Sequence, residues 1–181
     1  MEWYAYMVVV AIGILAGIIN TLAGGGSLIT LPLLMALGLP PNVANGTNRI
    51  AIFLQNVVGV SSFHREKVMD FPGGFRVGIP AAVGAVGGAF IAVNLNDEAM
   101  KLAIGGVMIL MFFVILLKPN RWIRSHEEHP PIPYWVQVIV FFLVGIYGGF
   151  IQAGVGFFLI ASLVLGSGFE LVKANALKLF I

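Results

Sequence analysis

The chain has 181 residues, of which 59% are hydrophobic and only 10% are charged, and it contains no cysteine. Soluble domains carry roughly 25% charged residues, so this composition excludes an ordinary soluble fold and indicates a protein built for lipid. The lack of cysteine excludes disulfides and thiolate metal sites. The formal net charge is +2, and the charged residues lie mainly in joints between apolar stretches, which argues against a nucleic-acid surface.

Five apolar stretches are predicted to form membrane-spanning helices, because a helix needs about 20 apolar residues to cross the hydrocarbon core. In chain order they cover residues 4–22, 47–63, 71–94, 99–117 and 134–153. The first has no basic start and no A-x-A cleavage pattern, so we expect a mature helix there and not a secretory signal. The sequence therefore predicts an all-α, polytopic membrane protein.

A glycine-rich break follows the first predicted helix, in AGGGSLITLPLLMALGL (residues 23–39). Glycine costs a helix roughly 1 kcal/mol relative to alanine, so we expect the helix to stop here and a new one to begin at Leu28, with Ser27 as its N-cap. About a dozen helical residues reach only about 18 Å. The segment is therefore either a re-entrant half-helix or a short membrane crossing completed by non-helical chain. Non-helical backbone inside a membrane is tolerated only where protein buries it or where it lines a water-filled cavity.

The same pattern recurs 130 residues later, where AGVGFFLIASLVLGSGFELVKANALKLFI (153–181) aligns with AGGGSLITLPLLMALGLPPNVANGTNRIA (23–51). The informative identities are three glycine pairs and one asparagine pair: Gly24/Gly154, Gly26/Gly156, Gly38/Gly168 and Asn45/Asn175. Short, glycine-interrupted segments at matching positions of two halves are typical of the binding site of a secondary transporter. We therefore predict two homologous repeats, each with a Gly-broken helix and a short half-helix.

The repeats divide the chain into a first membrane repeat (1–118), a cytoplasmic linker (119–133) and the start of a second, incomplete repeat (134–181). Because the second copy has no counterpart of residues 52–118, the chain is expected to be truncated. The joints 64–70 and 118–133 are basic and are predicted to be cytoplasmic, whereas 40–46 and 94–97 are predicted to be external. The repeats are inverted if the short segments count as crossings and parallel if they are re-entrant; inversion is favoured.

Two basic residues inside predicted helices, Arg49 and Lys178, point to an anionic substrate. A basic side chain at the centre of the bilayer costs at least about 2.5 kcal/mol, so we expect such residues to have a functional role. Alternatively, both side chains could reach the membrane surface by snorkelling. Unpaired N–H groups at a helix start also attract anions. With inverted repeats, Arg49 would lie toward the outer face and Lys178 toward the inner one.

The predicted substrate-binding residues combine these cations with the glycine breaks and the polar residues beside them. Asn20, Thr21 and Gln152 could instead bond helix to helix, and the asparagines and threonine near Arg49 and Lys178 could instead cap helices. Gln55 and Asn56 are interpreted as interhelical bonding residues. The full set is Asn20, Thr21, Gly24, Gly25, Gly26, Ser27, Asn45, Thr47, Asn48, Arg49, Gln152, Gly154, Gly156, Asn175 and Lys178.

Enzyme readings find little support in the sequence. A serine nucleophile needs a base in reach, but all three histidines lie in predicted loops, far from Ser27. The HEEH run (126–129) lacks the histidine spacing of HExxH, and GGGSLIT has no lysine for a phosphate-binding loop. We therefore expect no catalytic residues, no metal site and no cofactor.

Two segments carry a family resemblance. AGGGSLITLPLLMALGLPPNVANGTNRIAIFLQN and GGFIQAGVGFFLIASLVLGSGFELVKANALK resemble the two signature regions of the TauE/SafE-like sulfite exporter family. The resemblance implies a bacterial inner-membrane permease of two homologous halves, whose partners are the lipid bilayer and a small anionic substrate such as sulfite or an organosulfonate. The expected function is a secondary transporter, acting as an exporter, that binds the anion at the glycine-rich half-helix starts. A passive anion channel is the alternative.

Overall fold

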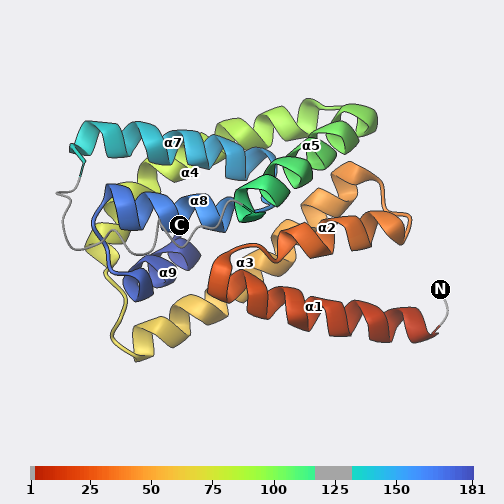
Figure 1. The fold of residues 1–181 in the computed structure, drawn as a ribbon, viewed down its shortest axis with the longest axis horizontal. Helices are drawn as coiled ribbons and strands as arrows, with labels where there is room; N and C mark the ends of the chain where they lie inside the picture. The colour runs from red at the N-terminus through yellow and green to blue at the C-terminus, as the bar shows by residue number, and fades with distance from the viewer. Residues whose placement is uncertain (1–2, 117–131) are drawn as a thin grey trace.

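The computed structural model describes residues 3–116 and 132–181, and all the regular elements in these ranges are helices (Figure 1). The predicted linker lies almost wholly outside the described residues, as does the HEEH run. In chain order the elements are α1 (Trp3–Ala23), α2 (Ser27–Ala36), α3 (Pro41–Arg65), α4 (Phe71–Asn94), α5 (Asp97–Leu116), α7 (Tyr134–Phe150), α8 (Val155–Ala161), the π-helical turn η1 (Ser162–Gly166) and α9 (Leu171–Phe180).

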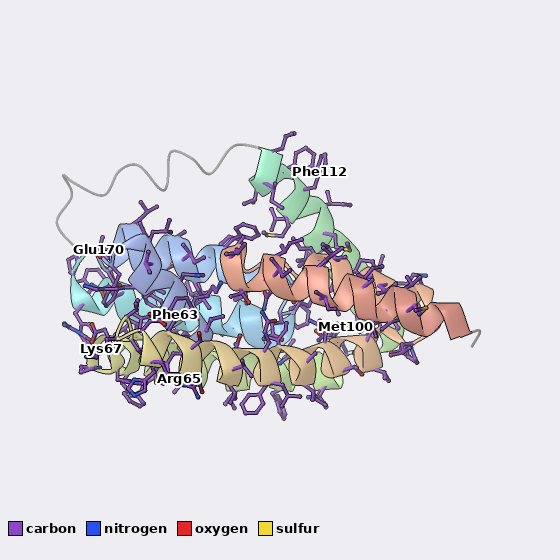
Figure 2. The ribbon with its side chains drawn as sticks, turned by 90° about the horizontal axis from the view of Figure 1, so that it is seen from below. Phe63, Arg65, Lys67, Met100, Phe112 and Glu170 are labelled. Atoms are coloured by element: carbon purple, nitrogen blue, oxygen red, sulfur yellow. The ribbon has the colours of Figure 1, made fainter. Side chains whose placement is uncertain are left out.

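The all-helical prediction is confirmed, and the outer surface suits lipid. By length and composition, α4 and α5 are both able to cross a membrane. Large apolar side chains point outward from the bundle: Phe112, which projects from α5 in Figure 2, is 61% exposed, and Val93 is 83% exposed. Soluble monomers rarely show apolar surface on this scale, so these faces are the ones that contact the acyl chains.

The closest helix packing is between α4 and α7, and glycines make it possible. A Cβ atom on Gly84 or Gly88 of α4 would overlap the backbone of α7, and one on Gly145 or Gly149 of α7 would overlap the backbone of α4. Small residues at four-residue spacing let membrane helices approach in this way. The sequence indicates this role for Gly84 and Gly88, and the structure adds their partners on α7.

Successive helices alternate in direction across the molecule (Figure 1). In that view α1 runs from right to left, α2 returns to the right, and α3 runs to the left again. The second set begins at the other end: α7 runs from left to right, α8 returns to the left, and α9 turns back. The helices α1 and α7 therefore point in opposite directions.

The joints gather at two ends of the bundle. Asn42 donates hydrogen bonds from Nδ2 to the carbonyl of Leu95 (3.0 Å) and to a carboxylate oxygen of Asp97 (2.9 Å), so the segments 40–46 and 94–97 meet at one end. Lys67 and Glu170 both lie at the opposite end, the left in Figure 2. The two predicted external joints are therefore grouped, and the basic joint 64–70 lies at the other end.

Three predicted helix starts are wrong. The second helix begins at Ser27 and not at Leu28; its N-cap residue is Gly26, and no side chain caps it. The next helix begins at Pro41, because proline has the backbone angle of a first helical position and needs no N–H partner there. The last begins at Leu171 after Glu170, before the start at Ala174 that the repeat predicts. Asn45, Thr47, Asn48 and Asn175 consequently lie inside helices and do not cap them.

The contact between α4 and α7 can be tested by adding a single methyl group. We expect Gly88→Ala to lower the midpoint of thermal unfolding in detergent, because its Cβ would overlap the carbonyl of Ile146 and overpacking costs about 1–3 kcal/mol. The control is Gly87→Ala, whose Cβ would meet nothing within 4 Å. That variant should keep or raise the midpoint, since alanine favours a helix. Equal midpoints for the two variants would contradict the packing.

Candidate functional site

Both glycine-rich segments interrupt a helix inside the bundle. The first helix ends at Ala23, Gly24 adopts a left-handed conformation (φ +82°), and α2 starts at Ser27. In the second set α7 ends at Phe150, Gly154 is left-handed (φ +75°), and α8 starts at Val155. L-residues with a side chain avoid this conformation, so the glycines at these two positions explain why the chain can turn there.

The two breaks touch each other through bare backbone. A Cβ atom on Gly24 would overlap the backbone of Gly156, and a Cβ atom on Gly156 would overlap the backbone of Gly24. Segments separated by more than 130 residues in the chain thus meet at their glycines. The glycines at these two positions therefore have a physical reason, because only residues without a side chain allow this approach.

A cavity of about 200 Å³ opens beside this contact. Glycines of both breaks line it, Gly24 from one and Gly156 from the other, together with small residues of α4 and α7. Its walls also include apolar side chains such as Ile52 and Leu159, and none of the described residues that line it is acidic. The polar side chains of the lining are Asn20, Arg49, Asn56, Gln152 and Lys178.

Arg49, on α3, is bonded to the end of α7. Its Nη2 donates to the carbonyl of Phe150 (3.0 Å) and to the carbonyl of Gly149. These carbonyls belong to the last turn of α7, where a helix has no N–H groups of its own to offer. A cation at a helix C-terminus is favourable by about 0.3–1 kcal/mol, and up to about 2 where partly buried. The guanidinium has five N–H donors, and its Nε and Nη1 groups have no partner among the described residues.

Lys178, on α9, is bonded in the same way to the end of α1. Its side chain is 5% exposed, and its Nζ donates to the carbonyls of Asn20 and Thr21, both at 2.9 Å. A third bond goes to Oδ1 of Asn175, at 2.7 Å. An ammonium group has three donors, so all of them are used. Each cation thus stabilises the end of the interrupted helix that belongs to the other segment.

Other predicted polar residues tie neighbouring helices together. Asn48 donates to Oγ of Ser27 (3.0 Å) and accepts from Oγ1 of Thr30 (2.6 Å), which fastens α2 to α3. Asn20 donates to Gln55 (3.1 Å), and Gln55 donates to Oγ1 of Thr21 (2.6 Å), which fastens α1 to α3. Hydrogen bonds of this kind hold helices together in membranes. The Ser27 hydroxyl is therefore engaged across helices, which is why it does not cap α2.

The predicted site residues divide into two groups. Six of them line the cavity: Asn20, Gly24, Arg49, Gln152, Gly156 and Lys178. The other nine lie outside the lining, and of these Thr47 is exposed on α3 while Asn45 donates to the carbonyl of Phe150 (3.1 Å). The nine are Thr21, Gly25, Gly26, Ser27, Asn45, Thr47, Asn48, Gly154 and Asn175.

The sequence predicts that Asn56 bonds to a neighbouring helix, and in the structure Asn56 lines the cavity. Arg49, Ile52 and Asn56 all line it, and their spacing of three and four residues puts them on one face of α3. That periodicity was the signal available in the sequence. The side-chain oxygens of Asn56 and Gln152 are buried and have no hydrogen-bond partner among the described residues. An unpaired buried polar atom is costly, so both amides are available to a ligand.

Electrostatically, the cavity suits an anion. It combines two basic side chains with neutral amides, and in residues 3–116 and 132–181 no three His, Cys, Asp or Glu side chains come together to hold a metal. The guanidinium of Arg49 can still donate from two of its nitrogens, in a fork that matches planar oxyanions. The arrangement can therefore bind a small oxyanion by charge-assisted hydrogen bonds.

The sequence is similar to known membrane proteins. The pattern of the family described as "Sulfite exporter TauE/SafE" matches residues 9–181. "Probable membrane transporter protein ORF9" of Sinorhizobium sp is 28% identical over 168 residues, which is 92% of this chain and 64% of the relative. "Probable membrane transporter protein YfcA" of Escherichia coli K12 is 29% identical over 167 residues, 91% of this chain and 61% of the relative. The chain thus spans under two thirds of their length. No solved structure matches.

The contact between the two breaks can be tested with matched glycine variants. We expect Gly24→Ala to lower the thermal midpoint in detergent more than Gly38→Ala does. Both glycines are left-handed (φ +82° and +92°), so both variants lose about 1–2 kcal/mol to backbone strain. Only the Cβ at position 24 would overlap another backbone, since nothing lies within 4 Å of the one at 38. An equal loss would show that the breaks do not pack tightly.

Proposed function

Since the chain belongs to the sulfite exporter TauE/SafE family, a family of membrane transporters and not of enzymes, we propose that it carries small sulfur-containing oxyanions, such as sulfite or organosulfonates, across the membrane. The observation that carries this proposal is the meeting of Arg49 and Lys178 in one cavity, at the point where two interrupted helices touch. Basic residues inside a bilayer mark substrate pathways. The proposed direction is export, across the bacterial inner membrane.

The substrate charge follows from the lining. Two basic side chains without an acidic neighbour in the described lining leave positive potential in the cavity, and a small anion compensates it. A water molecule takes up about 30 Å³ in the liquid, so about 200 Å³ holds an ion of sulfite size with some of its water. Asn56 and Gln152 add amide groups that can turn their NH₂ toward the oxygens of the anion.

The two half-helices contribute unequally to the proposed anion site. The start of α8 takes part, because Val155 and Gly156 line the cavity. The start of α2 does not, since Gly26 is packed against the backbone of Ala16 and Ser27 is buried against Asn48. The proposed site is therefore formed by Arg49, Lys178 and the amides around the second break, and only Gly24 comes from the first break.

The proposed architecture is a pair of inverted repeats, residues 1–118 and 134–181, joined by a cytoplasmic linker (119–133). The opposite directions of α1 and α7 in Figure 1 support inversion, as does the gathering of Lys67 and Glu170 at one end (Figure 2). The reciprocal bonds of Arg49 and Lys178 fit the same relation. Inverted repeats that meet at a central site are the basis of alternating access, so a carrier is favoured over a passive channel.

Counterflow in proteoliposomes separates the carrier from the channel. Liposomes that contain the protein are loaded with unlabelled sulfite and diluted into a trace of labelled sulfite. A carrier exchanges one anion for another, so we expect the label to accumulate transiently above its external concentration. A channel lets the label equilibrate without overshoot, and that result would replace the carrier by the alternative function.

Arg49→Ala should abolish sulfite flux, because it removes the guanidinium that retains free donors in the cavity. The matched control is Arg65→Ala, which removes an exposed arginine from the last turn of the same helix and should leave the flux unchanged. Thermal unfolding of both variants in detergent shows whether each is folded. Normal flux in a folded Arg49→Ala protein would remove this residue from the site.

A further inference from the structure

The hydrogen bonds of Lys178 leave its ammonium group no donor for a substrate. Its three N–H groups point to the carbonyls of Asn20 and Thr21 and to Oδ1 of Asn175, at 2.7–2.9 Å. An ammonium offers three donors and no more. An anion that binds directly to this nitrogen must therefore displace one of the three acceptors.

Arg49 is in a different position, although it also lines the cavity and is also bonded to a helix end. Only its Nη2 donates, to the carbonyls of Gly149 and Phe150. Among the described residues nothing accepts from its Nε or Nη1, so it can receive an anion while it keeps its bonds to α7. An anion can therefore bind to Arg49 without breaking a hydrogen bond, whereas binding to Lys178 requires one of its hydrogen bonds to break.

An anion in the cavity competes well for the ammonium. The bonds from the ammonium to the carbonyls already have one charged partner, but a backbone carbonyl carries only a partial charge, whereas an oxyanion adds the attraction between two full charges in a site of low dielectric constant. The carbonyl of Asn20 keeps a partner when the lysine leaves, because the N–H of Gly24 also donates to it (2.8 Å). Release of the lysine therefore does not leave that carbonyl unpaired.

Resting on the proposed function, we propose that Lys178 is a substrate-displaced latch between α9 and the end of α1. With the cavity empty, its ammonium holds the carbonyls of Asn20 and Thr21 and so keeps the first break against α9. When an oxyanion binds beside Arg49, the ammonium turns to the anion and releases these carbonyls. Binding of substrate is thereby converted into a loosening of the contact between the two segments, which is the movement that a carrier needs.

The chain offers a suitable place to observe this movement. Leu22, in the last turn of α1, and Val172, in the first turn of α9, line the same apolar groove and do not line the central cavity. Both are exposed, at 70% and 59%. Because the sequence contains no cysteine, Leu22→Cys and Val172→Cys give a pair of spin labels at defined positions. The distance between them reports the gap between α1 and α9.

The first measurement needs no anion. In the labelled protein we expect Lys178→Met, which removes all three donors, to shift the 22–172 distance to longer values. The matched control is Lys173→Met, on the same helix but exposed, and it should leave the distance unchanged. An unchanged distance in Lys178→Met would overturn the latch, whatever the protein transports.

The second measurement adds sulfite to the labelled protein with Lys178 intact. We expect the same shift to longer distances, together with a rise in the thermal midpoint that reports binding. If sulfite raises the midpoint and the distance does not change, the anion has taken the place of Asn175 Oδ1; the latch is then wrong and the proposed function stands. If sulfite raises neither the midpoint nor the distance, both proposals fail.

A third variant tests the latch without removing the lysine. Asn175→Ala takes away one acceptor and so gives the ammonium a spare donor. We expect this protein still to bind sulfite, while the shift in the 22–172 distance falls to less than half of that in the parent. A full shift in Asn175→Ala would contradict the donor count on which the latch depends.

Discussion

Every backbone carbonyl within a bilayer needs a hydrogen-bond donor, and this requirement decides the arrangement around the two interrupted helices. Lipid offers no donors, so those carbonyls at the ends of α1 and α7 that have no local N–H partner depend on other parts of the chain. The structure supplies them from a distance: Lys178 donates to the end of α1, and Arg49 and Asn45 donate to the end of α7. In both segments, therefore, an interrupted helix occurs together with a basic side chain that donates to its end.

The cavity is a consequence of the same arrangement. A glycine has no side chain to fill the space beside it, and here the left-handed turn at Gly24 lies against Gly156, the second residue of α8. The parallel pair α4 and α7 adds more glycine and alanine to the wall, because close packing of these helices already requires small residues. The open space thus lies where the cations are anchored, and the helix ends keep the positive groups at its edge.

Hydropathy and glycine content were enough to predict an all-helical fold and the positions of both breaks. They were not enough to predict which polar residues face the cavity. Asn48 and Asn56 are both amides on α3, but Asn56 lines the cavity while Asn48 is used in bonds to α2. That difference depends on helix rotation, which a single sequence does not show. The predicted caps failed for a related reason: Pro41 and Glu170 set earlier helix starts, so the asparagines were left inside the helices. The position of Asn56 in the cavity could have been predicted from the sequence, because Asn56 shares a helical face with Arg49.

The two basic residues of the cavity, Arg49 and Lys178, do not occupy matching positions in the repeat. At the 130-residue offset the counterpart of Lys178 is Asn48, whereas Arg49 lies one position further along its helix. One residue turns a helix by about 100°, so the first segment reaches the cavity from a different angle, and Asn48 is free to bind α2 to α3. The longer side chain of Arg49 still reaches the cavity and keeps N–H donors without a partner among the described residues. Lys178 uses all three of its donors. In the proposed function, therefore, the two segments share a scaffold but differ in role: Arg49 holds the anion, and Lys178 responds to it.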